Sequence, residues 1–156
     1  MRKLVLITVI MFFCSCGVKY VPVSVQPIEE TFEIKDQEKD LLFAKANTWF
    51  ALAFQNSKNV IQYSDKETGV ITGRFAILPQ VSRNGYGIQQ DNSIYSGIHV
   101  RLKDNGAKIV VSPDNFTEVH SSLNESYRFT KESAIAKSQE LINSFVTYLK
   151  QPVDDF

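Results

Sequence analysis

The chain has 156 residues, of which 44% are hydrophobic, and it carries 17 basic and 17 acidic side chains. Eleven Phe, six Tyr and one Trp supply enough apolar surface for one core, so we expect one folded domain. The balanced charge argues against nucleic acid as a partner, because binding to phosphates depends on an excess of Lys and Arg.

The first residues have the layout of a secretory signal peptide. Arg2 and Lys3 precede an uninterrupted apolar run from Leu4 to Phe13. As a helix, this run would reach only about 15 Å, half of the roughly 30 Å hydrocarbon core of a bilayer. We therefore expect residues 1–15 to be a cleaved leader and not a permanent transmembrane span.

The apolar run ends in Cys14-Ser15-Cys16-Gly17, which holds both cysteines of the chain. This end resembles the lipobox of bacterial lipoproteins, in which a cysteine receives a diacylglycerol on its sulfur and becomes the first mature residue. Cys16 fits that pattern best, because small residues flank it; lipidation at Cys14 or an uncleaved signal are the alternatives. A Cys14–Cys16 disulfide would be badly strained. The resemblance implies attachment to the cell membrane or outer membrane, on the extracytoplasmic side, through fatty acyl chains such as palmitate.

Residues 16–29 contain Pro22 and Pro27 and no helical period. We interpret them as an extended tether that could raise a domain roughly 40 Å from the bilayer. The alternative is that part of this segment pairs as an edge strand. The domain is expected over residues 30–150, with a tail at 151–156. Its first strand is predicted over Glu30 to Lys35.

Asp36 is predicted to cap a helix that reaches about Asn56. Its apolar stripe is read as core packing against a sheet and not as a cofactor site; the residues are Leu42, Phe43, Ala46, Trp49, Phe50, Ala53 and Phe54.

Two strands, Val60 to Ser64 and Val70 to Leu78, are predicted to follow. They flank a turn in which Gly69 adopts a positive φ. Gly73 lies on the apolar side of the second strand, where it would let a helix approach closely. Pro79 to Tyr95 is rich in Gly, Asn, Gln and Ser and is expected to be a long loop, of a kind that is often functional or disordered.

The segment Ser96 to Pro113 is predicted to be a hairpin that turns at Asp104-Asn105-Gly106. A polar connector follows, and Thr130 caps a last helix with one apolar stripe, consisting of Ala134, Ile135, Leu141, Ile142, Phe145 and Leu149. The predicted order is β-α-β-β-β-β-α. This order predicts an α+β fold in two layers, one antiparallel five-stranded sheet with both helices on one face.

The stretch from Trp49 to Gly73 is similar to an uncharacterised domain family of bacterial lipoproteins with a TATA-binding-protein-like fold. The recurring features are Trp49 with Phe54 five residues later, then Val60 to Tyr63, Asp65 and the Lys66 to Gly69 turn. The later hairpin around Asp104 also resembles the family, and the likeness covers roughly residues 30–149. The resemblance implies a fold and a lipid anchor, and it supplies no catalytic residue.

The sequence contains no residue pattern typical of a catalytic site or a metal-binding site. His99 and His120 are the only histidines, and the adjacency of His120 to Ser121 and Ser122 says nothing about a triad, which depends on spatial geometry. Two distant histidines do not make a zinc site, and no nucleotide-binding motif is present. We therefore predict no catalytic residue, no metal and no cofactor.

The open face of the sheet is the candidate binding site. Because successive side chains of a strand alternate between the two faces, a set of side chains that includes four Arg and Lys residues is expected to project from it: Thr72, Arg74, His99, Arg101, Lys103, Lys108 and Val110. The candidate binding loop contributes Arg83, Tyr86, Gln89 and Tyr95. We expect a non-enzymatic module that binds an envelope protein or a glycan. The alternatives are a carrier of a small apolar ligand between helix and sheet, or a hydrolase; the oligomeric state stays open.

Overall fold

The structure, a computed structural model, describes residues 19–152 apart from 55, 84, 86–88 and 121–128. The expected leader, Cys16 and the end of the tail lie outside these residues. The elements, in chain order, are β1 (Lys19–Val23), β2 (Ile28–Glu33), α1 (Lys39–Ala53), α2 (Ser57–Val60), β3 (Ile61–Asp65), β4 (Val70–Leu78), β5 (Val81–Arg83), β6 (Gln89–Asp91), β7 (Ile94–Lys103), β8 (Gly106–Pro113), β9 (Phe116–His120) and α3 (Lys131–Lys150).

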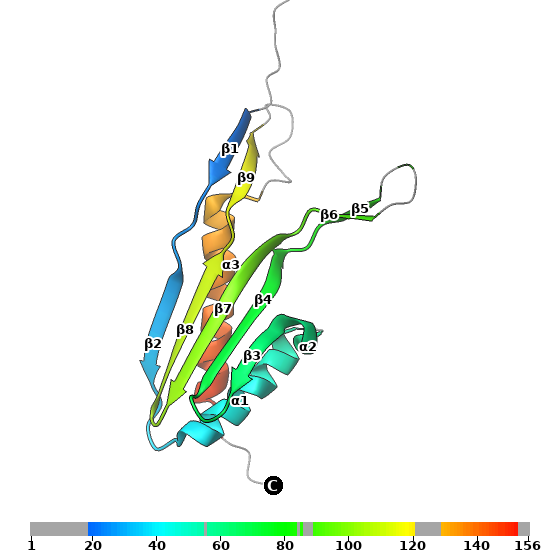
Figure 1. Ribbon diagram of the computed structural model, residues 1–156. Coiled ribbons are helices and arrows are strands. Elements are labelled where there is room, and N and C mark those ends of the chain that lie inside the picture. Colours follow the sequence, from blue (N-terminus) through cyan, green and yellow to red (C-terminus); the bar gives the residue numbers. More distant parts are fainter. Residues whose placement is uncertain (1–18, 55, 84, 86–88, 121–128, 153–156) are drawn as a thin grey trace, which may run out of the picture.

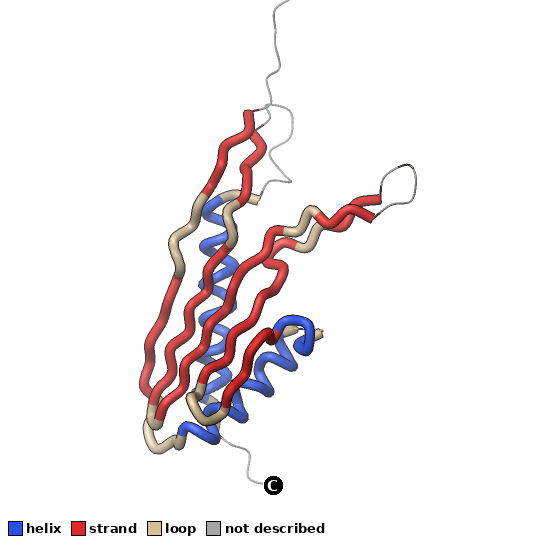
Figure 2. Tube along the Cα trace, viewed as in Figure 1, coloured by secondary structure: helices blue, strands red, loops and turns tan. Residues whose placement is uncertain are grey.

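Five strands form the main sheet, in the order β2-β8-β7-β4-β3, and every neighbouring pair is antiparallel. Helices α1 and α3 cover one face of this sheet, and the other face is open (Figure 1). The tube trace shows the same two layers, with the helices behind the strands (Figure 2). The predicted α+β class and the five-stranded sheet with both helices on one face are confirmed.

The core lies between the sheet and the two helices, and aromatic rings fill it. Trp49 and Phe50 of α1 are almost wholly buried, as is Phe145 of α3. Trp49 meets Phe145 edge to face, with ring centroids 5.0 Å apart, and its indole N–H donates to Ser144 Oγ at 3.2 Å. Each such side chain contributes about 1.5–3 kcal/mol by leaving water. The stripe on α1 is therefore core packing, as the sequence predicts, except for Ala53 in the last turn, which is exposed.

The β7–β8 hairpin turns at Asp104 and Asn105, and Asn105 takes the left-handed conformation with φ 60°. Its turn also provides the cap of α1. The helix begins at Lys39, whose backbone N–H donates to Asp104 Oδ1 at 2.8 Å. Asp36, the predicted cap, instead adopts a positive φ of 58° in the preceding loop. The prediction was wrong because a carboxylate 65 residues away satisfies the orphan N–H group.

The predicted tether is part of the folded body from Lys19 onward. Strand β1 pairs antiparallel with β9, which lies in the segment predicted to be a polar connector. Val23 and Val25 are buried with Phe116 and Ala134 in a second small core beneath this ribbon. Burial of these apolar side chains explains why a proline-containing segment forms a strand instead of a free spacer.

The predicted loop Pro79 to Tyr95 also contains regular structure. Strands β5 and β6 pair as a narrow extension of β4 and β7, and Figure 1 shows this extension projecting away from the sheet. Gly73 makes the close approach that the sequence predicts, because a Cβ there would lie 2.7 Å from the Val60 carbonyl oxygen of α2. Among the described residues, no helix combines the length and the apolar character needed to cross a bilayer.

Candidate functional site

The open sheet face is organised by the alternation of β7. Ile98, Val100 and Leu102 point into the core, so His99 and Arg101 project from the opposite face. Lys103 follows with the same alternation. Strand register places three more of the predicted face residues around them: Thr72 and Val110 beside His99, and Lys108 beside Arg101.

A hollow of about 560 Å³ lies at the end of this face where β7 and β8 meet their turn. We call it the cationic groove. It is lined by Thr31, Thr68, Val70, Arg101, Leu102, Lys103, Ala107 and Lys108. Three cationic side chains therefore surround a surface that also offers two hydroxyl groups and apolar contacts.

The charges of the cationic groove are only partly compensated. Lys108 Nζ lies 2.8 Å from Glu29 Oε2, in an exposed ion pair. Within the described part of the chain, Arg101 and Lys103 make no ion pair and no side-chain hydrogen bond. One guanidinium group and one ammonium group are therefore available to an anionic ligand.

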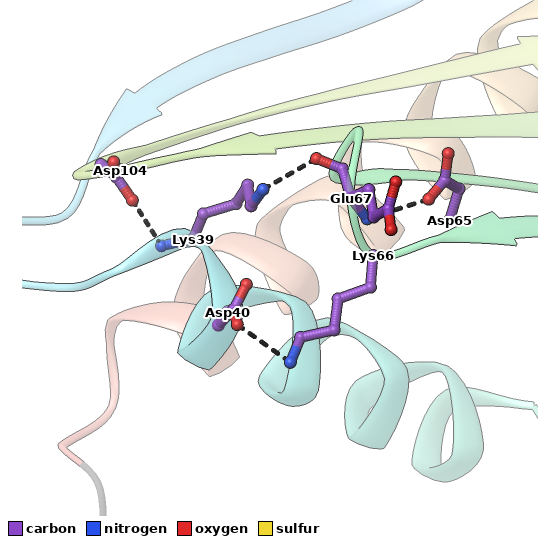
Figure 3. Close-up of polar contacts among 6 residues, drawn as sticks. All are labelled: Lys39, Asp40, Asp65, Lys66, Glu67 and Asp104. Carbon is purple, nitrogen blue, oxygen red and sulfur yellow. Dashed lines mark hydrogen bonds and ion pairs between the residues drawn. The ribbon is translucent and has the colours of Figure 1, made fainter.

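The rim of the groove is held by polar contacts between three separate segments (Figure 3). The Lys39 ammonium donates to the Glu67 carbonyl oxygen at 2.8 Å, while the Lys39 backbone N–H bonds Asp104. Lys66 forms an ion pair with Asp40 at 2.9 Å. The start of α1 thus ties together the β3–β4 and β7–β8 turns, which border the groove.

Asp65 shapes the β3–β4 turn beside the groove. One carboxylate oxygen accepts from the Thr68 hydroxyl at 2.8 Å, and the other accepts from the Glu67 backbone N–H at 2.9 Å. These bonds, that from Thr68 above all, lower the pKa of Asp65, because they stabilise the charged form. The hydrogen bond from Tyr63 to Asp65 raises the pKa of the tyrosine.

Arg74 and Tyr95 lie apart from the cationic groove. The Arg74 guanidinium pairs with Asp114 at 2.7 Å and stacks over the Tyr95 ring, 4.6 Å from its centroid. The Tyr95 hydroxyl donates to Asp91 Oδ2 at 2.5 Å, which raises the pKa of the phenol. Both side chains border a second hollow, of about 600 Å³, against the ends of α1 and α2. The structure therefore divides the predicted face residues between two places.

Of the other predicted loop residues, Arg83 and Gln89 do not line the groove. Arg83 and Gln89 pair across the β5–β6 extension, and Tyr86 lies outside the described residues. Tyr95 belongs to β7 and not to a loop.

Sequence reasoning missed Thr31 and Thr68 as lining residues. Thr31 reaches the groove because it pairs with Lys108, and this register between distant strands leaves no local signal. Thr68 reaches the groove because its hydrogen bond to Asp65 fixes the conformation of the β3–β4 turn.

Of the two histidines, the structure describes the side chain of His99 alone. His99 stands between Thr72 and Val110 and makes no hydrogen bond there. No group of three or more His, Cys, Asp or Glu side chains in the described ranges could hold a metal ion. The described part of the chain does not include the side chain of His120, nor does it include Ser121 and Ser122.

Comparison with known proteins agrees with this architecture. Residues 29–117 match the model of a family described as a domain of unknown function (DUF4468) with TBP-like fold. No curated protein matches the chain.

Among solved structures, a TBP-like protein from Parabacteroides distasonis ATCC 8503 is 13% identical, with a TM-score of 0.53, over 80% of this chain and 92% of that one. A DUF4468 family protein from Bacteroides ovatus ATCC 8483 is 14% identical, with a TM-score of 0.48, over 83% of this chain and 89% of that one. At 13% identity, the similarity to the Parabacteroides distasonis protein shows the fold alone. The five-stranded antiparallel sheet with its two covering helices, together with the match over residues 29–117, shows that the chain belongs to the DUF4468 family of TBP-like fold.

Proposed function

We propose that this protein is a lipid-anchored, non-catalytic binding module of the bacterial cell envelope, and that its cationic groove holds a segment of an anionic glycan. The observation that carries the proposal is the pair of cations, Arg101 and Lys103, which border a hollow of about 560 Å³ without ion-pair partners among the described residues.

The chemistry of the lining fits a charged sugar. A uronate or sulfate group pairs well with a guanidinium, which offers two parallel N–H donors. The hydroxyls of Thr31 and Thr68 add neutral hydrogen-bonding partners for sugar hydroxyls. Val70 provides an apolar contact for a sugar ring face.

The packing of the interior favours the groove over a cavity between helix and sheet. Leu42, Ala46 and Phe50 are fully buried on α1, and Trp49 closes the space toward α3. An apolar ligand of the kind considered from the sequence would have to displace these side chains. Two hollows lie at the margin of this core, one beside Phe54 and Phe75 and one between Ile77 and Leu141, and either could hold such a ligand.

The lipid anchor is supported by the position of Cys16 after a cationic start and an apolar run. Metabolic labelling with a palmitate analogue, in the native type of bacterial host, tests it. We expect labelling of the wild-type protein and of Cys14→Ala, and none of Cys16→Ala. Labelling that persists in Cys16→Ala would contradict the assignment.

Charge reversal tests the groove. We expect the Arg101→Glu/Lys103→Glu variant to lose at least tenfold in affinity for a heparin-derived tetrasaccharide or an oligogalacturonate, measured by calorimetry, because attraction becomes repulsion. Binding by the wild type should weaken with added salt. The variant Lys58→Glu/Lys131→Glu has the same charge change on exposed positions outside the groove and should bind like the wild type.

Two results would overturn the glycan proposal. The first is an unchanged affinity of the Arg101→Glu/Lys103→Glu variant. The second is wild-type protein that binds neither anionic oligosaccharide but retains an acidic protein, through the same two residues, in pull-downs from detergent-solubilised envelope.

A further inference from the structure

The β1–β9 ribbon has two different faces. Val23 and Phe116, opposite each other in the register, are buried against the second small core. The other face carries the pair Tyr20 and Val119, of which 67% and 39%, respectively, is exposed to solvent. The outer face of the ribbon therefore presents an aromatic ring and an aliphatic side chain to solvent, side by side on adjacent strands.

The ribbon is also the part of the described structure closest in sequence to the proposed anchor. Lys19 is three residues after Cys16, and an extended chain spans at most about 3.6 Å per residue. A lipid on Cys16 therefore holds Lys19 within about 11 Å of its sulfur-bearing residue, whatever path the chain takes. The hypothesis of a 40 Å spacer does not apply, because the fold begins at β1.

We propose that the outer face of the β1–β9 ribbon, through Tyr20 and Val119, lies against the phospholipid surface; this inference depends on the proposed anchor at Cys16. Tyrosine is suited to this place, because its ring enters the interfacial region while its hydroxyl stays hydrated.

This contact orients the whole molecule. In Figure 1, β1 and β9 lie at one end, and the tips of β2 and β7 lie at the opposite end. The Asp104 turn and the cationic groove belong to that opposite end. The contact therefore leaves the groove at the end of the molecule farther from the anchored ribbon, on the side that α3 does not cover and that Tyr20 and Val119 share.

Spin labelling of the lipidated full chain tests the contact. The protein is reconstituted in nanodiscs of phosphatidylethanolamine and phosphatidylglycerol, with single cysteines introduced as Tyr20→Cys, Val119→Cys, Thr117→Cys or Leu52→Cys. Leu52 on α1 is the matched control, because 70% of it is exposed, close to the value for Tyr20. Mass spectrometry first establishes the lipid on Cys16.

The readout is the ratio of label accessibility to oxygen, which partitions into lipid, and to a water-soluble nickel complex. We expect this ratio to be several times higher at positions 20 and 119 than at 52, with an intermediate value at 117. Two labelled positions in the contact keep the test valid if one substitution disturbs folding.

Three other results are distinguishable. A water-like ratio at 20 and 119 on protein that carries the lipid overturns the membrane contact and leaves the anchor intact. Strong label-to-label coupling at position 20 would show that a second copy covers the face and would also overturn the contact. A chain without lipid on Cys16 overturns the anchor, and this inference with it.

Discussion

Gly69 sets the border of the cationic groove through one backbone angle. Its φ is 68°, in the left-handed region that side chains disfavour. Its carbonyl accepts from the Leu102 backbone N–H at 2.8 Å, and a Cβ at this position would collide with the Leu102 carbonyl oxygen. The turn that carries Thr68 is thereby pressed against β7.

We expect Gly69→Ala to lower the free energy of unfolding by about 2 kcal/mol or more, because the new methyl adds a collision to a strained φ. Urea denaturation followed by circular dichroism measures this change. Gly97→Ala is the control: its Cβ would lie 3.8 Å from the Ser112 carbonyl oxygen, so its stability should change by less than about 0.5 kcal/mol. Equal stability of the two variants would contradict this account of Gly69.

At the scale of elements, a partly buried cation of α1 binds the C-terminal end of α3. Lys45 of α1 donates from its ammonium to the carbonyl oxygens of Leu149 at 2.6 Å and Gln151 at 2.5 Å, at the C-terminal end of α3. Burial lowers the pKa of Lys45, since it disfavours the charged form. The charge still satisfies carbonyl groups that a helix end leaves without intrahelical partners.

The opposite end of α3 is capped locally. The Thr130 hydroxyl accepts from the Ser133 backbone N–H at 3.2 Å, as the sequence predicts. The N-terminus of α3 is therefore capped by the adjacent residue Thr130, whereas its C-terminal carbonyl groups bind Lys45 of α1.

We expect Lys45→Met to lower the free energy of unfolding by about 1–2 kcal/mol, because the carbonyl groups at the end of α3 lose their charged donor while the aliphatic stem is kept. Lys58→Met, at an exposed position of α2, should change it by less than about 0.5 kcal/mol. Thermal and urea unfolding of both variants measure the difference. A Lys45→Met protein as stable as wild type would show that water replaces the ammonium without loss.

At the scale of the whole molecule, a second small core extends the sheet-and-helix body toward the N-terminus. Val23 and Val25 reach it from the segment around β1, Phe116 from β9 and Ala134 from the first turns of α3. This core packs the N-terminal segment against α3.

We expect a lipid-free chain that begins at Gln26 to be less stable, by a few kcal/mol, than one that begins at Gly17. The shorter chain loses the burial of Val23 and Val25 and exposes Phe116. Hydrogen exchange measures this locally: amides of β9 should exchange much faster in the shorter chain, whereas those of β7 should change less. Unchanged protection of β9 would contradict a structural role for β1.

The regular part of the fold could be predicted from the sequence because its signals are local. Alternation in Ile98, Val100 and Leu102 identifies a strand with one buried face, and the spacing of Trp49 and Phe50 identifies the helix that covers it. Strand β4 and the cap at Thr130 fall where the sequence places them.

What the sequence could not predict depends on pairing between distant segments. Strand β9 is polar at several positions, and it forms because β1 lies beside it, nearly a hundred residues earlier in the chain. The cap of α1 at Asp104 has the same origin.

For the candidate site, the sequence by itself determined which side chains leave the sheet, since the two-residue period of a strand fixes the face of every residue in it. Only the tertiary structure decided which of them act together. Register brings Thr31 and Lys108 to Arg101, while Asp114 and Tyr95 draw Arg74 into a separate cluster. The physical reason is that a face is a property of one strand, whereas a groove and the charges that remain unpaired in it are properties of strands and turns that meet only in the folded chain.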